Sequence, residues 1–367
     1  MAIAILYREE LKEYDFGPGH PFRGDRYEIF PRFLRENLAE DDHYRFLEAD
    51  WASDQDLLRI CDHDYIEATK QYYRAAHLGL SINGRAYRYH SLDNVPRGKP
   101  GRLEEAARLI VGQAKLAADL TQRGEFLKVV SLGGGMHHAK RDYGEGFCLY
   151  NDVAFAAIYL MEEYGLERIL IVDTDAHAGN GTSEYFYSSP NVLFIDLHQD
   201  PRTLYPGTGF VSEIGSGEGK GFTVNIPLPV GAGDDSYRLV FEEIVQPLAE
   251  EFQPQMVIRN GGSDPYFNDG LTQLGMTLSG FRMIGQRVRE IAELCQGKLI
   301  DLIASGYNRE VLPRAWLALL SGLAGFDISI EPPEPVPPRF QQDPSYEQTT
   351  KVVAAVKSTL REYWGRL

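Results

Sequence analysis

The chain has 367 residues, and 43% of them are hydrophobic, so a sizeable buried core is expected. Acidic residues outnumber basic ones by 53 to 37, and the net charge of −16 argues against tight binding to nucleic acid, which favours a basic surface. The apolar run that opens the sequence is too short for a signal peptide, and no stretch reaches membrane-spanning length. With only three widely spaced cysteines, these features predict a protein of the reducing cytoplasm.

Five short apolar runs each end in a polar or glycine-rich cluster, and helical segments lie around them. The runs, in chain order, are Lys128–Leu132, Arg168–Val172, Val192–Ile195, Met256–Arg259 and Leu299–Ile303. Helical apolar spacing falls in Arg102–Thr121, Asn151–Glu163, Asp235–Phe252, Leu278–Glu293 and Pro313–Leu320. Strands that alternate with helices predict an α/β fold, with a central, mostly parallel sheet and helices on both faces.

Two further elements are expected after residue 330. Glu331–Pro338 is rich in proline and is typical of an extended connector, and Thr349–Trp364 has the apolar spacing of a terminal helix. Because α/β folds reach this size around one core, we expect residues 1–367 to form a single catalytic domain. The pattern does not determine the oligomeric state, so a homo-oligomer stays open.

The polar clusters indicate one shared site. In open α/β sheets a ligand lies outside the carboxyl ends of the strands, and all five clusters fall at such ends. Each cluster alone also fits an ordinary turn, since Gly, Asn and Asp favour turns. Five of them together, with four of the nine histidines, favour a common site over five unrelated turns.

The cluster that follows Val172 suggests metal ligands. If the strand continues, Asp173, Asp175 and His177 alternate onto one face, where two of them can reach a cation while the third lies behind. Asp264 ends another predicted strand and can supply a third ligand. Three protein ligands and an open position are typical of catalytic zinc. The alternative is that these are solvated loop residues or helix N-caps.

Two other strand ends carry groups suited to proton transfer and oxyanion binding. His137 and His138 are adjacent after three glycines, and a histidine of near-neutral pKa suits general acid and base work. A carboxylate behind one of them would fix its tautomer, and Asp173 is the candidate. Tyr307 follows Gly306, and its phenol can donate to a carbonyl oxygen that becomes an oxyanion. A lone histidine or tyrosine is more often part of the core.

The ordered clusters resemble the signature blocks of histone deacetylases and their relatives, the acetylpolyamine amidohydrolases and acetoin-utilisation proteins. The blocks are GGGMHHAKRDYGEGFCLYND, DTDAHAGNG, LYPGTG, NGGSD and SGYN, with DFGPGHPFRGDR near the start. The resemblance spans roughly residues 5 to 325. It implies an arginase/deacetylase-like fold and a zinc-dependent amidohydrolase that removes acetyl or other acyl groups from acylated lysine or polyamine amines.

The resemblance also assigns site residues by motif position. The ligands for one Zn2+ per chain are Asp175, His177 and Asp264. The catalytic residues are His137, His138 and Tyr307, with Asp173 and Asn180 behind the histidines. The substrate-binding residues are Gly146, Phe147, Tyr205, Leu271 and Asp93. Of these, Gly146 and Phe147 would form the wall of a narrow tunnel with Tyr205 opposite, Leu271 would lie at its rim, and Asp93 would hold the substrate backbone.

Two departures from many relatives bear on the histidine roles. Ala178 stands where many have a second histidine, and Asn180 where some have an aspartate behind the second tandem histidine. Asn carries no negative charge, so His138 should be less readily protonated than it would be beside Asp. We therefore expect His138 to be the main base and acid, with His137 tuned by Asp173.

A structural potassium ion is a further implication of the resemblance. Its site would use Asp173 and backbone carbonyls near His177 and Leu197. Asp196 stands in this region where many relatives have serine. Whether this chain binds potassium is left open by the sequence.

Two other functions fit parts of the pattern. A ureohydrolase shares the fold but uses two manganese ions, and it needs an aspartate where this chain has Gly179. A non-catalytic sensor of acetyl ligands would have lost Tyr307 or the tandem histidines, and both are present. The motifs do not separate a small acylated polyamine from an acyl-lysine peptide, although the acidic charge leans towards a polyamine. We expect neither nucleic acid nor a membrane as a partner.

Overall fold

The computed structural model describes residues 2–80 and 88–367 of the chain. The described residues form two compact units. Unit 1 comprises Met1–Gly165 and Leu302–Ala304, and unit 2 comprises Leu166–Asp301 and Ser305–Leu367. The prediction of a single domain stays a prediction.

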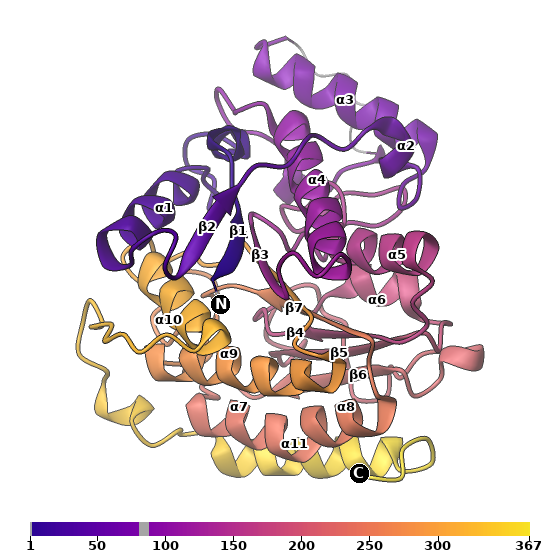
Figure 1. Cartoon of the computed structure of the whole chain (residues 1–367), viewed down its shortest axis with the longest axis vertical. Coiled ribbons are helices and arrows are strands. Elements are labelled where there is room, and N and C mark those ends of the chain that lie inside the picture. Colours follow the sequence, from indigo (N-terminus) through magenta and orange to yellow (C-terminus); the bar gives the residue numbers. More distant parts are fainter. Residues whose placement is uncertain (1, 81–87) are drawn as a thin grey trace. The chain divides into compact units, whose positions relative to one another are not determined.

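The strands confirm the predicted α/β class (Figure 1). Their order is β2-β1-β3-β8-β7-β4-β5-β6, and β8 (Leu299–Ile303) divides its residues between the two units. The pairings of β1 with β2 and β3, and of β4 with β5 and β7, are parallel, as is that of β5 with β6. Parallel strands covered on both faces consist of nearly continuous apolar runs, and β1 and β4 are buried along their whole length.

Unit 1 is built around β1, which lies between β2 and β3. The longest helix of this unit, α4, packs against α5 and β3, and its buried face is rich in alanine and leucine. The bounds are β1 (Ile3–Leu6), β2 (Tyr44–Leu47), β3 (Lys128–Leu132), α1 (Arg26–Asn37), α2 (Asp54–Leu57), α3 (His63–His77), α4 (Leu103–Gln122) and α5 (Asp152–Tyr164).

Unit 2 is built around β4, whose last residue Asp173 lies level with Asp196 of β5 and Asn260 of β7. This register places three polar side chains next to one another on three neighbouring strands, at the end of β4. Helix α9 packs against α10, and α11 packs against α7 and β6. The bounds are β4 (Ile169–Asp173), β5 (Val192–Gln199), β6 (Thr223–Leu228), β7 (Met256–Gly261), α6 (Asn180–Phe186), α7 (Asp234–Val240), α8 (Gln246–Phe252), α9 (Leu278–Ala292), α10 (Leu312–Ala324) and α11 (Tyr346–Leu360).

The predicted elements agree with the structure except at several ends. The run Val192–Ile195 continues as strand to Gln199, so the cluster DLHQ lies on β5 instead of after it. The helix expected at Asp235–Phe252 is α7 and α8 joined by a π-helical segment, Phe241–Val245. The terminal helix starts earlier and ends at Leu360. Trp364 lies beyond it, buried, and donates its indole N–H to the carbonyl of Gly221 at 2.8 Å.

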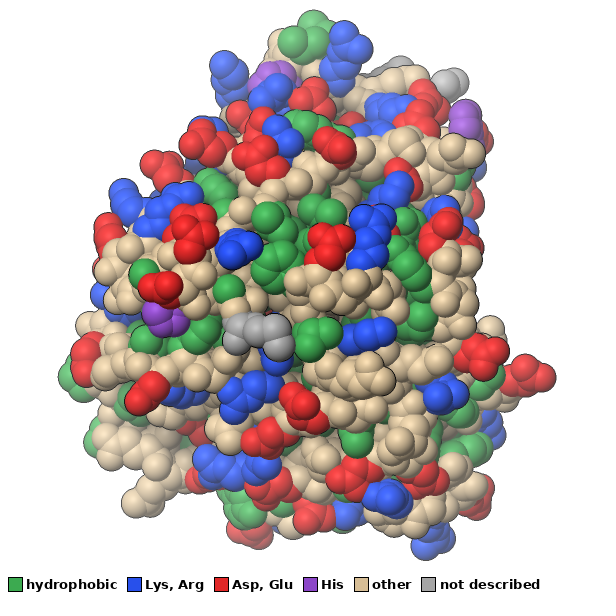
Figure 2. All heavy atoms as spheres, viewed as in Figure 1, with side chains coloured by type: hydrophobic (Ala, Val, Ile, Leu, Met, Phe, Trp, Pro, Cys, Tyr) green, Lys and Arg blue, Asp and Glu red, His purple; other side chains and the backbone are tan. Residues whose placement is uncertain are grey.

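The surface and the helices agree with the bulk composition. Among the described residues, no helix combines the length and apolar character needed to cross a membrane. On the face drawn in Figure 2, the acidic and basic side chains of the described residues lie interspersed with apolar ones. The three cysteines, Cys61, Cys148 and Cys295, are free thiols in the core.

Candidate active site

Unit 2 brings together three side chains that can hold a metal ion. Asp175, His177 and Asp264 are buried, and their ligand atoms all lie within 4.8 Å of one another. His177 Nδ1 is 3.0 Å from Asp175 Oδ1 and 3.0 Å from Asp264 Oδ2. These are the three ligands expected from the sequence.

The loop after β4 reaches this arrangement by turning, because the strand ends at Asp173. Asp173 Oδ1 accepts a hydrogen bond from the Asp175 N–H at 3.1 Å, and Asp175 Oδ1 accepts one from the His177 N–H at 2.9 Å. Aspartates that bind the backbone two residues on are typical of turns. The expectation that the strand continues and places these residues on one face was therefore wrong, although Asp175 and His177 still meet.

Asp264 is positioned by the glycines before it and by a serine from the next strand end. A Cβ on Gly262 would lie 2.1 Å from the carbonyl oxygen of Ser305, so only glycine allows this approach. The Ser305 hydroxyl then donates to Asp264 Oδ1 at 2.7 Å. The Thr272 hydroxyl donates to the Asp264 carbonyl oxygen. The glycines of the motif NGGSD thus allow Ser305, which is distant in sequence, to approach and orient the Asp264 carboxylate.

The electrostatics of the three ligands favour a bound cation. Burial and the nearby charge of Asp175 raise the pKa of Asp264 to about 7. Burial disfavours the charged form of His177 and so lowers its pKa. The hydrogen bonds of His177 to the carboxylates of Asp175 and Asp264, and the negative charges of these groups, outweigh burial and raise the pKa of His177 to about 10. A proton therefore stabilises the cluster, and a metal cation would meet the same need. Two carboxylates and an imidazole suit a divalent transition metal.

Tyr307 lies at the end of the β8 segment, where Asp269 holds its backbone. Asp269 Oδ2 accepts from the Tyr307 N–H at 2.7 Å, and its other oxygen accepts from the Leu271 N–H at 2.9 Å. Burial raises the pKa of Asp269 to about 6. Asp269 was not among the predicted residues. In the sequence, Asp269 and the glycine after it are typical of an ordinary turn. The fold shows that this turn positions Tyr307 and Leu271.

Other predicted residues of unit 2 lie at its surface or on the loop after β4. Tyr205 and Leu271 are 41% and 38% exposed. Their roles, Tyr205 opposite the tunnel wall and Leu271 at the rim, stay predictions. Asn180 is the first residue of α6. Before it, the Gly179 N–H donates to Asp196 Oδ2 at 2.8 Å.

The predicted potassium site stays a prediction. Both oxygens of Asp173 already accept hydrogen bonds, one of them from the Asn260 amide at 2.8 Å. The other oxygen of Asp196 lies 3.0 Å from His198 Nδ1, and both residues are buried. Because the carboxylates have protein partners, backbone carbonyls would supply most of the contacts to a monovalent cation.

The tandem histidines of unit 1 are nearly fully buried, with ring centroids 4.1 Å apart. The start of α5 holds their loop. Asp152 accepts from the N–H groups of Gly135 and Met136, at 2.9 and 2.7 Å. Desolvation nevertheless raises the pKa of Asp152 to about 7, with His137 acting in the opposite direction. Asp152 was not predicted either.

Gly146 is required by the position of His138. It has a φ of +58°, and a Cβ there would lie 2.1 Å from His138 Cδ2. The Gly146 N–H donates to Asp93 Oδ2 at 2.9 Å, and the Ser91 hydroxyl donates to the same carboxylate. The structure thus brings together three predicted residues, His138, Gly146 and Asp93, within unit 1.

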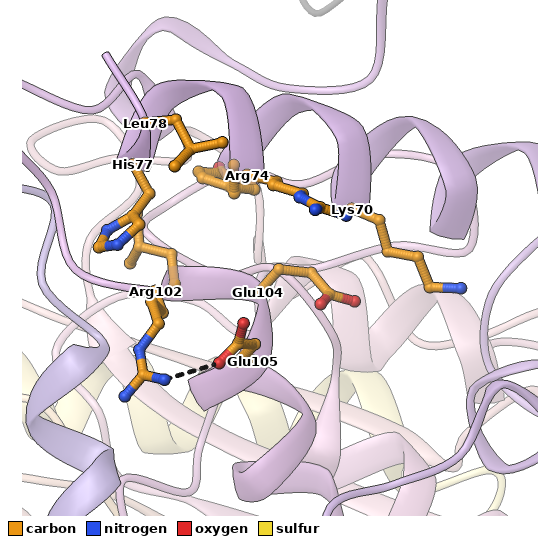
Figure 3. A pocket seen from close by; sticks show the side chains of 9 residues that line it. Lys70, Arg74, His77, Leu78, Arg102, Glu104 and Glu105 are labelled. Atoms are coloured by element: carbon orange, nitrogen blue, oxygen red, sulfur yellow. Dashed lines mark ion pairs between the residues drawn. The ribbon is translucent and has the colours of Figure 1, made fainter. Parts of the chain in front are cut away.

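A cavity of about 570 Å³ lies between α3 and the first turn of α4 (Figure 3). Most of its charged side chains are paired within the protein. Arg102 pairs with Glu105, and Lys70 pairs with Asp54 and Glu67. Glu104 pairs with Arg108 at 2.6 Å. These pairs lie within α3, join α3 to α2, or lie at the start of α4, and we assign the cavity no part in the chemistry.

Comparisons with known proteins agree with this fold and these residues. A family model described as the histone deacetylase domain matches residues 20–323. A probable deacetylase of Archaeoglobus fulgidus is 34% identical over 371 residues and covers 99% of each chain. The acetoin utilization protein AcuC of Bacillus subtilis is 35% identical, covering 90% of this chain and 84% of its own. The solved HD domain of HDA15 matches with a TM-score of 0.83 at 26% identity, over 99% of this chain and 95% of that one.

The parallel α/β fold and the buried Asp–His–Asp set define an enzyme that can hold a metal ion among its strand ends. The chain belongs to the histone deacetylase family, and it is a hydrolytic deacetylase. The resemblance that the ordered motifs indicated is thereby confirmed.

Proposed function

We propose that this enzyme is a zinc-dependent amidohydrolase that removes acetyl or other acyl groups from acylated lysine or polyamine amines. The observation that carries the proposal is the buried set Asp175, His177 and Asp264, with ligand atoms within 4.8 Å. Three protein ligands of this kind, with a further position open to substrate, suit one catalytic zinc. Gly179, in place of a further aspartate, favours one metal over the two of a ureohydrolase.

The chemistry assigned to the residues follows from their types. When bound, zinc would polarise the amide carbonyl and lower the pKa of a water. Tyr307 donates a hydrogen bond to the carbonyl oxygen as negative charge develops on it. His138 takes the proton of the attacking water and gives it to the leaving amine, with His137 tuned by Asp173. By motif position, Asn180 would provide an uncharged partner for His138 in place of an aspartate.

The substrate-binding assignments are also part of the proposal. Gly146 and Phe147 would form one wall of the acyl path with Tyr205 opposite, Leu271 would lie at its rim, and Asp93 would hold the substrate backbone. The net charge of −16 favours a cationic amine, such as an acylated polyamine, over an acidic peptide. Free, buried cysteines are in keeping with a cytoplasmic enzyme.

The test is a hydrolysis panel on protein of measured metal content. It would compare an acetyl-lysine peptide, acetylputrescine, acetylspermidine and longer acyl amides, before and after removal and return of zinc. We expect hydrolysis of at least one class, loss on chelation and recovery with one equivalent of zinc. Recovery only with two manganese ions per chain would replace the proposal with a ureohydrolase.

A further inference from the structure

Phe147 has a backbone conformation that a residue with a side chain rarely adopts. Its φ is +66°, directly after Gly146 at +58°. For an L-residue other than Asn or Asp, this left-handed region is disfavoured unless neighbouring groups hold it. The fold must therefore supply contacts that fix this pair of residues.

Asn94 supplies most of those contacts from a different segment. Its side-chain oxygen accepts from the Phe147 N–H at 2.7 Å, and its amide nitrogen donates to the Cys148 carbonyl at 2.8 Å. The Tyr14 hydroxyl donates to the Phe147 carbonyl at 2.7 Å. The N–H and the carbonyl of Phe147 thus each have a side-chain partner. Asn94 is fully buried and forms hydrogen bonds on both sides of the turn.

Asn94 is itself held in place. The Tyr73 hydroxyl donates to its carbonyl at 3.0 Å, and His20 Nε2 lies 2.9 Å from the carbonyl of Asp93. His20 Nδ1 accepts from the Phe22 N–H at 3.0 Å, so the proton of this imidazole is on Nε2, which donates to Asp93.

The same histidine also contacts the Phe147 ring. Their centroids are 4.7 Å apart and their planes are nearly perpendicular. Phe16 and Phe22 complete the apolar surroundings, each with its centroid 6.3 Å from that of Phe147. Backbone and ring of Phe147 are therefore fixed by one connected set of groups, in which Asn94 binds the backbone on both sides of the turn.

We propose that Asn94 is a positioning residue that sets the orientation of Phe147 and thereby limits the width of acyl group that the enzyme accepts. The inference rests on the proposed function, in which Phe147 lines the acyl path. Asn94 does not touch the substrate. It acts through the turn that carries Phe147. Its loss should therefore relax the selectivity between acyl groups more than it lowers the rate of the chemical step.

The experiment compares Asn94→Ala with the wild type on acetyl, butyryl and hexanoyl amides of one amine. We expect kcat/KM for the acetyl substrate to fall mainly through KM. We also expect the butyryl-to-acetyl ratio of kcat/KM to rise about tenfold, the scale of a one- or two-methylene discrimination. Tyr14→Phe, which removes only the donor to the Phe147 carbonyl, should shift the same ratio in the same direction by less.

Thr121→Val is the matched control. Thr121 is fully buried in the same unit, and its hydroxyl donates to carbonyls of its own helix, those of Ala117 and Ala118. It should lower the unfolding temperature without changing the ratio. A ratio unchanged in both Asn94→Ala and Tyr14→Phe, with the wild type active, overturns the inference alone. A wild type that hydrolyses none of the amides with metal bound overturns the proposed function, and the inference falls with it.

Discussion

Two loops at strand ends carry the predicted chemistry, and they are held in different ways. The loop after β4 is organised by its own aspartates, Asp173 and Asp175, which bind the backbone two residues on. It presents His177 to two carboxylates, its own Asp175 and Asp264 from the segment after β7. The loop after β3 is organised from outside, by Asp152 at the start of α5. The first loop contributes negative charge to a cluster that a cation must balance. In the second loop, one buried carboxylate binds two backbone N–H groups just before the tandem histidines.

The largest effect is expected from removing one side of the charged cluster. Asp264→Ala should lower metal affinity by more than about 100-fold, the upper range for changes in the partners of metal ligands. Turnover should fall with it. Metal content per chain after dialysis, and activity at saturating zinc, measure the two effects. Asp235→Asn, an exposed carboxylate on α7 of the same unit, is the control. Full zinc occupancy in Asp264→Ala would remove this residue from the ligand set.

The next effect separates the metal from the oxyanion donor. Tyr307→Phe should keep its metal, because its backbone N–H and not its phenol binds Asp269. Turnover should fall by a factor that corresponds to a loss of about 2.7–4 kcal/mol of transition-state stabilisation, which is typical of removing one oxyanion donor. Steady-state kinetics at measured zinc content test this. Unchanged turnover would mean that Tyr307 takes no part in the reaction.

A smaller effect tests the packing of the histidine loop. Gly146→Ala would place a Cβ against the His138 ring, whereas Gly165, at a similar φ of +66°, has no atom within 4 Å of a Cβ. Gly165→Ala should cost about 1 kcal/mol of stability. Gly146→Ala should add about 1–3 kcal/mol for overpacking and lower turnover as the ring shifts. Urea unfolding and kinetics compare the two. Equal costs, with full activity, would show that the loop yields freely.

The last effect is spread over several pH units and concerns the buried carboxylate of the same loop. Since the pKa of Asp152 is raised to about 7 in the fold, the folded chain binds more protons at this group than the unfolded chain does. Its contribution to stability is therefore greatest at low pH and declines as pH rises from about 4 towards 7. Asp152→Asn should remove this decline, so that its free energy of unfolding relative to the wild type improves by up to about 1.4 kcal/mol per pH unit. Denaturant curves at pH 5, 6 and 7 measure it, and parallel curves would contradict it.

The sequence was most informative where neighbours in the chain are neighbours in space. Asp175 and His177 lie two residues apart, so the spacing alone suggested a ligand pair. The prediction of Asp264 as a third ligand also required the alternation of strands and helices, because this pattern places the strand ends at one edge of the sheet. The turn after Asp173 was missed because strand alternation does not reveal where a strand ends.

Asp152, Asp269 and Asn94 escaped prediction for a different reason. Each acts on the backbone of another segment, and that contact leaves no local pattern beyond an ordinary cap or turn residue. The strands β1 and β2 have only four residues each, and the apolar run of the longer β6 is not followed by a distinctive cluster. Long-range contacts of this kind become visible only once the fold is known.

The spacing of the ligands has a consequence for how the enzyme would lose its metal. His177 and Asp264 are 87 positions apart along the chain. An ion held by both would act as a clip that closes a long loop, and closing long loops removes the most freedom from the unfolded chain. Release of the metal and opening of unit 2 would then be thermodynamically linked, so that the resistance of this unit to unfolding becomes a readout of free zinc concentration.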